Sequence, residues 1–302
     1  MNLNVSIGSI VFDNPVTVAS GTFSAAEKFY GLKGWKRLGA IVPKTITLHA
    51  REGNPPPRIW ETPAGMINAI GLENAGTKAF ITDKLPGLAS IGRPLIISVL
   101  GYSVEEFQSI VELLAGSPEI VAIELNLSCP NLKQKKLVAQ DPQAAQQIVA
   151  AVKRISSKPM IAKLSPNVTD ITEIAQAVEA AGADAISLVN TFSAMAIDIH
   201  KQKPVLGNIT GGLSGPAIRP IAVCMVYQTY KKVNIPIIGM GGIMTAGDAI
   251  EFILAGATMV AVGTANFIQP QVPLDVLNGI RQYMKDRKIA DVKDLIGAAH
   301  RA

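Results

Sequence analysis

The sequence predicts a (β/α)8 barrel, in which eight parallel strands close into a cylinder and helices cover its outside. Short, nearly continuous apolar runs recur along the chain, and stretches with the spacing of an amphipathic helix separate most of them. Strands buried on both faces of a parallel sheet have this continuous apolar character. Regular alternation of such strands with helices is typical of a parallel barrel. In addition, almost every run ends in a polar residue or a glycine, at the rim where barrels carry their functional groups.

The apolar runs, taken in chain order, give the expected strands. They are Val16–Ser20, Ala40–Lys44, Leu95–Leu100, Ile120–Leu125, Met160–Lys163, Ala185–Val189, Ile235–Gly239 and Met259–Val262. The expected helices are Val104–Leu114, Pro142–Ile155, Ile171–Ala181, Ala246–Ala255 and Leu274–Lys285. Asp170 precedes one of them and is suited to cap it. A long insertion from His49 to about Pro86 is rich in proline and glycine, and loops of this length are usually functional or disordered.

An open, doubly wound sheet is the alternative fold. When that fold binds a dinucleotide it carries Gly-x-Gly-x-x-Gly after an early strand, and no such motif follows the early strands here. A chain of 302 residues could form one large domain or two ordinary ones. No shift in composition marks a boundary or a linker, so we expect residues 1–302 to form a single barrel domain.

Composition and charge narrow the classes of function. The net charge of +5 is mild, and the basic residues are scattered, which argues against a nucleic-acid partner and suits a small anionic ligand. No basic segment followed by an apolar one opens the chain, and no apolar run is long enough to span a membrane, so we expect a cytoplasmic protein without membrane association. Two cysteines are too few for a disulfide scaffold, and no Cys/His cluster has metal-site spacing. Cys224 lies in a helix-like stretch, Ala217–Val233, where we expect it to be buried.

Glycines follow the last two expected strands. Gly241 and Gly242 come after the seventh strand, and Gly263 with Thr264 comes after the eighth. Barrels often bind phosphate at these two loops, where backbone N–H groups act as donors and glycine allows close approach. Either pair by itself could serve only to form a turn, but the two pairs together favour a phosphate site.

Lysines and asparagines mark the other parts of the expected rim. Lys44 and Lys163 end apolar strands, where a charge is costly unless it meets an anion or stays solvated. One lysine could hold a ligand carboxylate, and the other could stabilise negative charge on a reduced cofactor ring. Asn68, Asn126 and Asn190 would together suit a flat heterocycle with several N–H and C=O groups, although a single asparagine often only caps a turn.

The stretch from Glu124 to Asn131 combines a buried strand with reactive side chains. Within six residues it carries two amides, a hydroxyl and a thiol, namely those of Asn126, Ser128, Cys129 and Asn131. A cysteine beside a proline turn is accessible enough to react, whereas its plain alternative is a small apolar filler. The three histidines lie in expected loops or at the terminus, so a hydrolytic Cys/His pair is disfavoured and proton transfer by the thiolate is favoured.

Four motifs together resemble class 1 dihydroorotate dehydrogenases. They are the stretches Arg51–Arg58, Asn68–Leu72, Asn126–Asn131 and Gly211–Ala217. The resemblance extends from about Val11 to Phe267, which is nearly the whole chain. It implies an FMN-binding barrel that oxidises (S)-dihydroorotate to orotate in de novo pyrimidine (UMP) biosynthesis.

The resemblance also implies a role for individual residues. Cys129 matches the general base that removes the C5 proton while hydride passes from C6 to flavin N5. The residues that match contacts to the pyrimidine and its carboxylate are Lys44, Asn68, Ala69, Ile70, Gly71, Leu72, Asn126, Asn190 and Thr191. The residues that match contacts to FMN are Ser20, Lys44, Thr45, Ser98, Asn126, Lys163, Val189, Gly215, Gly241, Gly242, Gly263 and Thr264. No metal ligand is expected.

Several loops are similar to the 1B subclass. The similarity lies in Ile70, Glu73–Asn74, Ala196–Asp198 and Gly207–Thr210. The 1B form works with a separate subunit that carries FAD and a 2Fe–2S cluster and passes electrons to NAD, which implies a heterotetramer built on a homodimer of this chain. The sequence has neither a cysteine cluster for that centre nor an NAD fingerprint, so a partner would have to supply both.

Three other functions remain open at this point. They are a fumarate-using 1A-like dehydrogenase, an FMN barrel that reduces another pyrimidine or the uridines of RNA, and a flavin-binding protein without activity. The sequence also departs from the family at two places. The loop Leu132–Gln140, which matches the lid over the cysteine, lacks the usual glycine, and Ser98 stands where asparagine is common beside the flavin.

Overall fold

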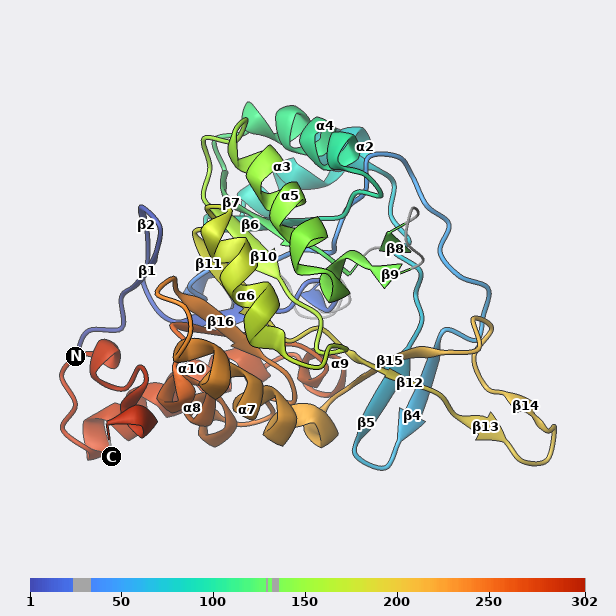
Figure 1. The fold of residues 1–302 in the computed structure, drawn as a ribbon. Coiled ribbons are helices and arrows are strands. Elements are labelled where there is room, and N and C mark those ends of the chain that lie inside the picture. The colour runs from blue at the N-terminus through green and yellow to red at the C-terminus, as the bar shows by residue number, and fades with distance from the viewer. Residues whose placement is uncertain (24–33, 129, 132–135, 302) are drawn as a thin grey trace.

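The computed structural model describes residues 1–23, 34–128, 130–131 and 136–301. A seven-stranded parallel sheet forms its centre, in the order β3-β17-β16-β11-β10-β7-β6. The strands are β3 Val16–Val18, β6 Leu95–Val99, β7 Ile120–Asn126, β10 Met160–Lys163, β11 Ala185–Leu188, β16 Ile237–Met240 and β17 Met259–Val262. The sheet curls on itself as a (β/α) barrel with helices around it (Figure 1), as the sequence predicts.

The segment 39–46 occupies the eighth position of the barrel, between β3 and β6. The backbone N–H of Gly39 donates to β3 at 2.9 Å, and that of Ile41 donates to the residue before β6, also at 2.9 Å. The expected strand Ala40–Lys44 is therefore in its expected place but is not a regular strand, because it makes only isolated bridges. Pro43 in this segment has no N–H to give to a ladder of hydrogen bonds.

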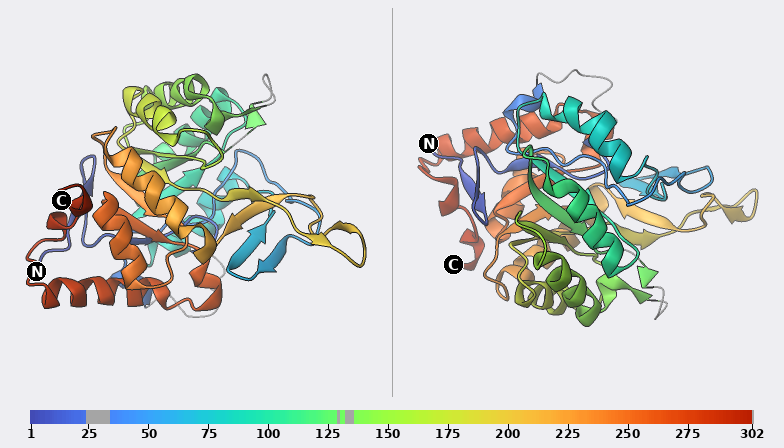
Figure 2. Two further views of the ribbon diagram at one scale, coloured as in Figure 1. Left: turned by 60° about the horizontal axis from the view of Figure 1, so that its bottom comes forward. Right: turned by 90° about the horizontal axis from the view of Figure 1, so that it is seen from above.

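Within the described ranges, six helices of ten or more residues cover the outside of the sheet (Figure 2). They are α4 Val104–Ala115, α5 Pro142–Lys153, α6 Ile171–Ala180, α7 Arg219–Tyr230, α8 Ala246–Ala255 and α10 Val272–Asp286. Local capping explains where two of them begin. The side chain of Asp170 accepts a hydrogen bond from the N–H of Thr172 at 2.8 Å, as expected for the cap of α6. Thr245 and Asp248 form a reciprocal capping box at the start of α8.

An antiparallel sheet stands beside the barrel and was not expected from the sequence. Its order is β12-β15-β5-β4, and its strands are β4 Ile59–Thr62, β5 Gly65–Asn68, β12 Phe192–Ala194 and β15 Gly211–Ser214. The insertion from His49 to Pro86 thus contains a β-hairpin rather than loop alone. The sheet has a small core of its own around Ile67 and Leu206. In Figure 1 it lies to the right of the barrel, on the side away from both termini.

Shorter elements complete the described chain. The strands and α-helices among them are β1 Val5–Ile7, β2 Ile10–Phe12, β8 Pro130–Asn131, β9 Lys136–Leu137, β13 Ile197–Asp198, β14 Lys203–Pro204, α2 Thr77–Ala79, α3 Leu85–Ala89 and α9 Ala265–Ile268. Cys224 is exposed, against the expectation of burial, because α7 packs through Ala222, Val226 and Thr229 instead. Among the helices of the described ranges, none combines the length and apolar character needed to cross a membrane.

Candidate active site

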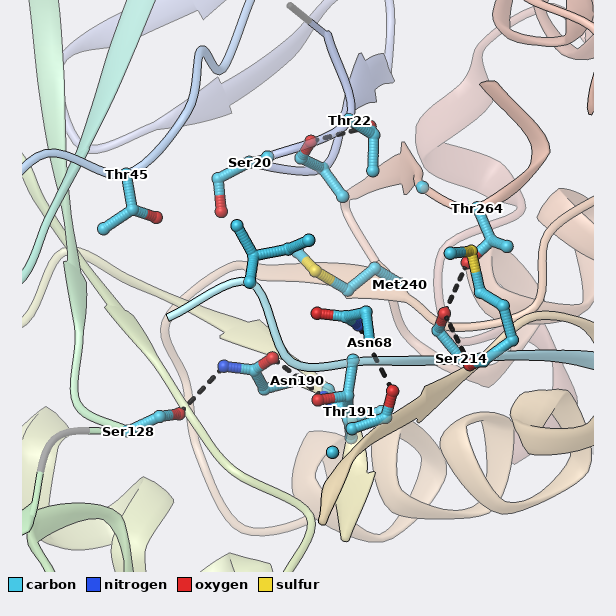
Figure 3. A pocket seen from close by; sticks show the side chains of 18 of the residues that line it. Ser20, Thr22, Thr45, Asn68, Ser128, Asn190, Thr191, Ser214, Met240 and Thr264 are labelled. Carbon is cyan, nitrogen blue, oxygen red and sulfur yellow. Dashed lines mark hydrogen bonds between the residues drawn. The ribbon is translucent and has the colours of Figure 1, made fainter. Parts of the chain in front are cut away.

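A cavity of about 590 Å³ lies at the carboxyl ends of the barrel strands, next to the antiparallel sheet. Its volume is in the usual range for a site that binds a small molecule or a cofactor. All parallel strands end at one rim, so side chains from distant parts of the sequence converge there. Figure 3 shows such a convergence, with Ser20, Thr45, Asn190 and Thr264 around one space.

Most of the residues singled out from the sequence line this cavity. They are Ser20, Lys44, Thr45, Asn68, Ala69, Ile70, Gly71, Leu72, Asn126, Lys163, Val189, Asn190, Thr191, Gly215, Gly241, Gly242, Gly263 and Thr264. Ser98 is not among the lining residues. It is fully buried, and its hydroxyl is hydrogen-bonded to that of Thr45 at 2.9 Å. Cys129 lies outside the described residues.

The asparagine amides on one side of the cavity are linked to one another. The Nδ2 of Asn190 donates to Ser128 Oγ at 2.8 Å and to Asn126 Oδ1 at 3.5 Å. The Oδ1 of Asn190 accepts the N–H of Thr191 at 2.8 Å, and Figure 3 shows both bonds of Asn190 that involve Ser128 and Thr191. Asn68 is held from the antiparallel sheet, where its Nδ2 donates to Gly212 O at 3.2 Å. These contacts orient the amides before any ligand binds.

Lys44 also faces the cavity, and its surroundings disfavour its charge. Burial lowers the pKa of its ammonium below the ordinary value of 10.5, the nearby carboxylate of Glu73 acts in the opposite direction, and the guanidinium of Arg58 lowers the pKa further. An anionic ligand group at Lys44 would replace the lost hydration and favour the charged form. The position therefore suits recognition of a carboxylate or another anion.

Lys163 provides a second ammonium, at the floor of the cavity. It is 5% exposed, and its Nζ donates to Ser20 Oγ at 3.1 Å. The carboxylate of Glu124, on the neighbouring strand β7, lies 4.0 Å from Nζ. The sequence indicated that a lysine at this strand end needs an anion, and the structure supplies one from inside the barrel.

Glycines and hydroxyls line another part of the cavity. Gly241 and Gly242 have φ values of 133° and 74°, a region that other residues rarely adopt. A Cβ atom on Gly242 would lie 2.8 Å from the carbonyl oxygen of Gly215, so a side chain has no room there. The hydroxyl of Thr264 donates to Ser214 Oγ at 2.8 Å (Figure 3). Exposed backbone and hydroxyl donors of this kind are suited to a phosphate group.

Several polar residues that line the cavity were not predicted from the sequence as site residues. They include Ser165, Asn167, Ser193 and Ser214. The Nδ2 of Asn167 donates to the carbonyl oxygen of Thr191 at 3.0 Å, and its Oδ1 accepts from the N–H of Ser193 at 2.8 Å. Asn167 thus fixes the chain after β11. Ser165 and Asn167 follow a strand end, so the rule used for the other strands would have found them.

Within the described ranges, the site holds no group of three or more His, Cys, Asp or Glu side chains that could bind a metal ion together. Its chemistry is instead that of two ammonium groups, a set of amides and a glycine-lined end. A ligand that matches it would have a flat polar ring and at least one anionic group.

Comparison with known proteins agrees with this arrangement. A family model described as "Dihydroorotate dehydrogenase" matches residues 2–284 of the chain. Relatives carrying the name "Dihydroorotate dehydrogenase B (NAD(+)), catalytic subunit" are similar over almost their whole length. The protein from Trichlorobacter lovleyi is 51% identical over 98% of this chain and 98% of its own. The one from Desulforudis audaxviator is 51% identical over 98% and 97%, and the one from Caldicellulosiruptor bescii is 51% identical over 99% of both.

Proposed function

The chain belongs to the dihydroorotate dehydrogenase family, and from this premise we propose that it oxidises (S)-dihydroorotate to orotate in de novo pyrimidine biosynthesis, with FMN as its cofactor. The observation that carries the proposal is the single cavity in which the matched lysines, amides and glycines meet. Bound FMN would supply the hydride acceptor. The chain's own residues would bind and orient the two molecules and move the proton.

The cavity fits FMN at both of its chemical ends. The glycine-lined part, with Gly241, Gly242, Gly263 and Thr264, has no room for added side chains at Gly242 and would hold the phosphate. Lys163, Ser20 and Thr45 lie toward the barrel floor and would contact the ring. Asn126, Val189 and Gly215 also line the space and would complete the cofactor contacts, while Ser98 would act only through Thr45.

The other side of the cavity would hold the substrate. Asn126, Asn190 and Thr191 are joined by hydrogen bonds, and Asn68 is fixed from the antiparallel sheet. With Lys44 and the loop Ala69–Leu72 they would hold the pyrimidine ring and its carboxylate. Cys129 would remove the C5 proton as general base. A positioned base of this kind contributes typically about 10²–10⁴-fold to the rate.

The proposal extends to a partner subunit. The relatives are named as NAD(+)-linked catalytic subunits, and these names do not favour the fumarate-using alternative. We propose that an electron-transfer subunit with FAD and a 2Fe–2S cluster accepts electrons from this chain, in a heterotetramer built on a homodimer. We also propose that residues 1–302 fold as one domain and that the protein works in the cytoplasm.

An anaerobic titration tests the function. The purified chain is expected to show the visible spectrum of a bound flavin, and added dihydroorotate is expected to bleach it. Bleaching would establish the cofactor, the substrate and hydride transfer in one measurement. A flavin absorbance band that does not change when dihydroorotate is added would contradict the substrate assignment. The lack of any flavin band would contradict the assignment of FMN as the cofactor.

The electron acceptor requires a separate test. We expect the chain alone to reduce NAD only slowly after its flavin has been bleached, because the sequence has neither the NAD fingerprint nor the cysteine cluster for that transfer. NADH formation is followed by absorbance, with fumarate as the control acceptor. Rapid NAD reduction by the chain alone would rule out the need for a partner, and fumarate-dependent orotate formation would favour the 1A-like alternative.

Orotate affinity is expected to fall as pH rises toward 10.5, the ordinary pKa of lysine. Burial lowers the pKa of Lys44 in the free protein, whereas a bound carboxylate stabilises the ammonium and raises the pKa. Binding therefore takes up a proton above the lowered pKa, and affinity falls by up to about tenfold per pH unit there. Calorimetric titration of orotate at several pH values measures the effect.

The variants for this test separate Lys44 from other groups. The titration is done in a Cys129→Ala background, because a cysteine thiol ordinarily ionises at a pKa of about 8.5. Lys44→Arg is expected to remove the pH dependence while keeping affinity, since arginine stays protonated. Lys44→Met is expected to bind orotate weakly at every pH. The same pH dependence in Lys44→Met as in the parent would show that another group causes it.

A further inference from the structure

A buried ion pair lies directly below the cavity. Glu124 on β7 and Lys163 on β10 belong to neighbouring parallel strands, whose register pairs Lys163 with Asn126, two residues beyond Glu124. Alternate residues of a strand point to the same side, so Glu124 lies one layer deeper than Asn126. Glu124 is 2% exposed and Lys163 is 5% exposed. Lys163 lines the cavity, whereas Glu124 does not.

The two carboxylate oxygens of Glu124 have different surroundings. Oε2 accepts a hydrogen bond from the hydroxyl of Ser187 on β11 at 2.9 Å. Oε1 lies 4.0 Å from Lys163 Nζ and has no hydrogen-bond partner among the described residues. The separation is too long for a direct hydrogen bond but short enough for a strong interaction between charges in a buried place. Glu124 therefore opposes the charge of Lys163 without taking up its N–H donors.

The ammonium of Lys163 therefore interacts with two groups, one beside the cavity and one below it. It donates to Ser20 Oγ at 3.1 Å, and Ser20 also lines the cavity. From below, the carboxylate of Glu124 cancels part of the positive potential that the ammonium would otherwise project into the cavity. The net charge of the floor thus depends on a residue that touches no ligand.

We propose that Glu124 is a positioning residue that, through Lys163, sets how strongly the cavity floor favours the reduced, negatively charged flavin over the oxidised, neutral one. The inference rests on the proposed function, since it requires FMN in the cavity. With Glu124 charged, the Glu124–Lys163 pair has no net charge. With Glu124 neutral, the floor carries one positive charge and stabilises the reduced flavin more strongly.

A purely structural role for Glu124 would have different consequences. A carboxylate that served only to keep a buried lysine compatible with folding would change stability when removed, because it leaves an uncompensated buried charge. It would not change the balance between the two oxidation states of a bound flavin. The reduction potential of the flavin therefore distinguishes the two roles, whereas turnover alone does not.

The experiment measures that potential in Glu124→Gln. Glutamine keeps the shape of the side chain and can still accept the hydrogen bond from Ser187, but it removes the charge. The FMN bound to wild type and variant is titrated anaerobically against a reference dye. We expect the equilibrium constant for reduction to increase at least about tenfold in the variant, which corresponds to an upward shift of about 30 mV for a two-electron couple.

Three further variants make the test specific. Ser187→Ala removes the hydrogen bond but keeps both charges, so its potential is expected to stay closer to wild type than that of Glu124→Gln. Glu124→Asp keeps the charge but moves it away from Lys163, so a smaller upward shift is expected, and it replaces Glu124→Gln if that variant does not fold. In a Lys163→Met background the shift caused by Glu124→Gln is expected to be smaller, because the two residues are coupled and only the direct effect of the carboxylate on the flavin remains.

The outcomes separate this inference from the proposed function. Wild-type protein that binds no FMN would overturn both, and this is seen before any variant is made. If dihydroorotate bleaches the FMN of the wild-type protein, but the reduction potential of FMN is the same in Glu124→Gln as in wild type, the inference alone is overturned. A downward shift in Glu124→Gln, or a shift that is undiminished in the Lys163→Met background, would overturn it as well.

Discussion

Cys129→Ala is expected to slow dihydroorotate oxidation by about 10²–10⁴-fold, which is the usual contribution of a positioned general base. Alanine cannot accept the C5 proton, so hydride transfer would have to proceed without the coupled loss of that proton. FMN is expected to remain bound, because all the residues proposed to hold it except Asn126 come from other strand ends of the barrel. Stopped-flow measurement of flavin bleaching by dihydroorotate gives the rate, and the flavin absorbance of the purified variant gives the FMN content.

The second cysteine provides a matched control. Cys224 is exposed on α7, so Cys224→Ala removes the other thiol of the chain from the outer surface of the barrel. We expect it to leave both bleaching rate and FMN content unchanged. If Cys129→Ala bleached as fast as Cys224→Ala, Cys129 could not be the base and the flavin-binding protein without activity on dihydroorotate would need to be reconsidered.

Gly242→Val is expected to weaken FMN binding by more than about 100-fold, on the basis of two combined effects. The φ of 74° at this position is unfavourable for a β-branched residue, at roughly 1–3 kcal/mol. The new Cβ would also lie 2.8 Å from both the Gly215 carbonyl oxygen and Arg219 Cβ, which forces the glycine-lined end of the cavity to move. Fluorescence titration of the flavin-free protein with FMN measures the affinity.

A neighbouring glycine tests whether this effect is local to the site. Gly247 lies in the first turn of α8, and the nearest atom to an added Cβ is Thr245 Oγ1 at 3.6 Å, which is ordinary contact. Gly247→Ala is expected to keep FMN affinity and to stabilise the fold slightly, since alanine favours a helix over glycine. Circular dichroism of both flavin-free variants checks their folding. Tight FMN binding by a folded Gly242→Val protein would contradict a phosphate site at this loop.

The local pattern of apolar and polar residues was sufficient to predict most strands and helices of the barrel. The bounds of β10, β17 and α8 agree with the expected ones at both ends, because an apolar run buried on both faces and a capped amphipathic helix depend mainly on neighbouring residues. The expected strand Ala40–Lys44 was placed correctly but is irregular. A regular strand needs a continuous ladder of hydrogen bonds, and Pro43 has no N–H to contribute to one.

The antiparallel sheet could not be derived in the same way. Its central pair joins Asn68 on β5 with Gly212 on β15, residues that are far apart in the chain. Neither segment has the alternating apolar pattern that marks a strand by itself. The resemblance to a family pointed to both motifs as functional, but only their pairing explains how Asn68 is held at the cavity.

The sequence by itself determined the barrel class, the family and the kinds of side chain at the rim, because parallel strands carry their functional groups at their carboxyl ends whatever the details of packing. Only the tertiary structure decided that Ser98 lies behind Thr45, that Cys224 faces outward, and that Glu124 is the anion below Lys163. These three facts depend on the register of neighbouring strands and on the rotation of a helix about its axis. Both are set by packing between segments distant in sequence, which no local pattern of residues records.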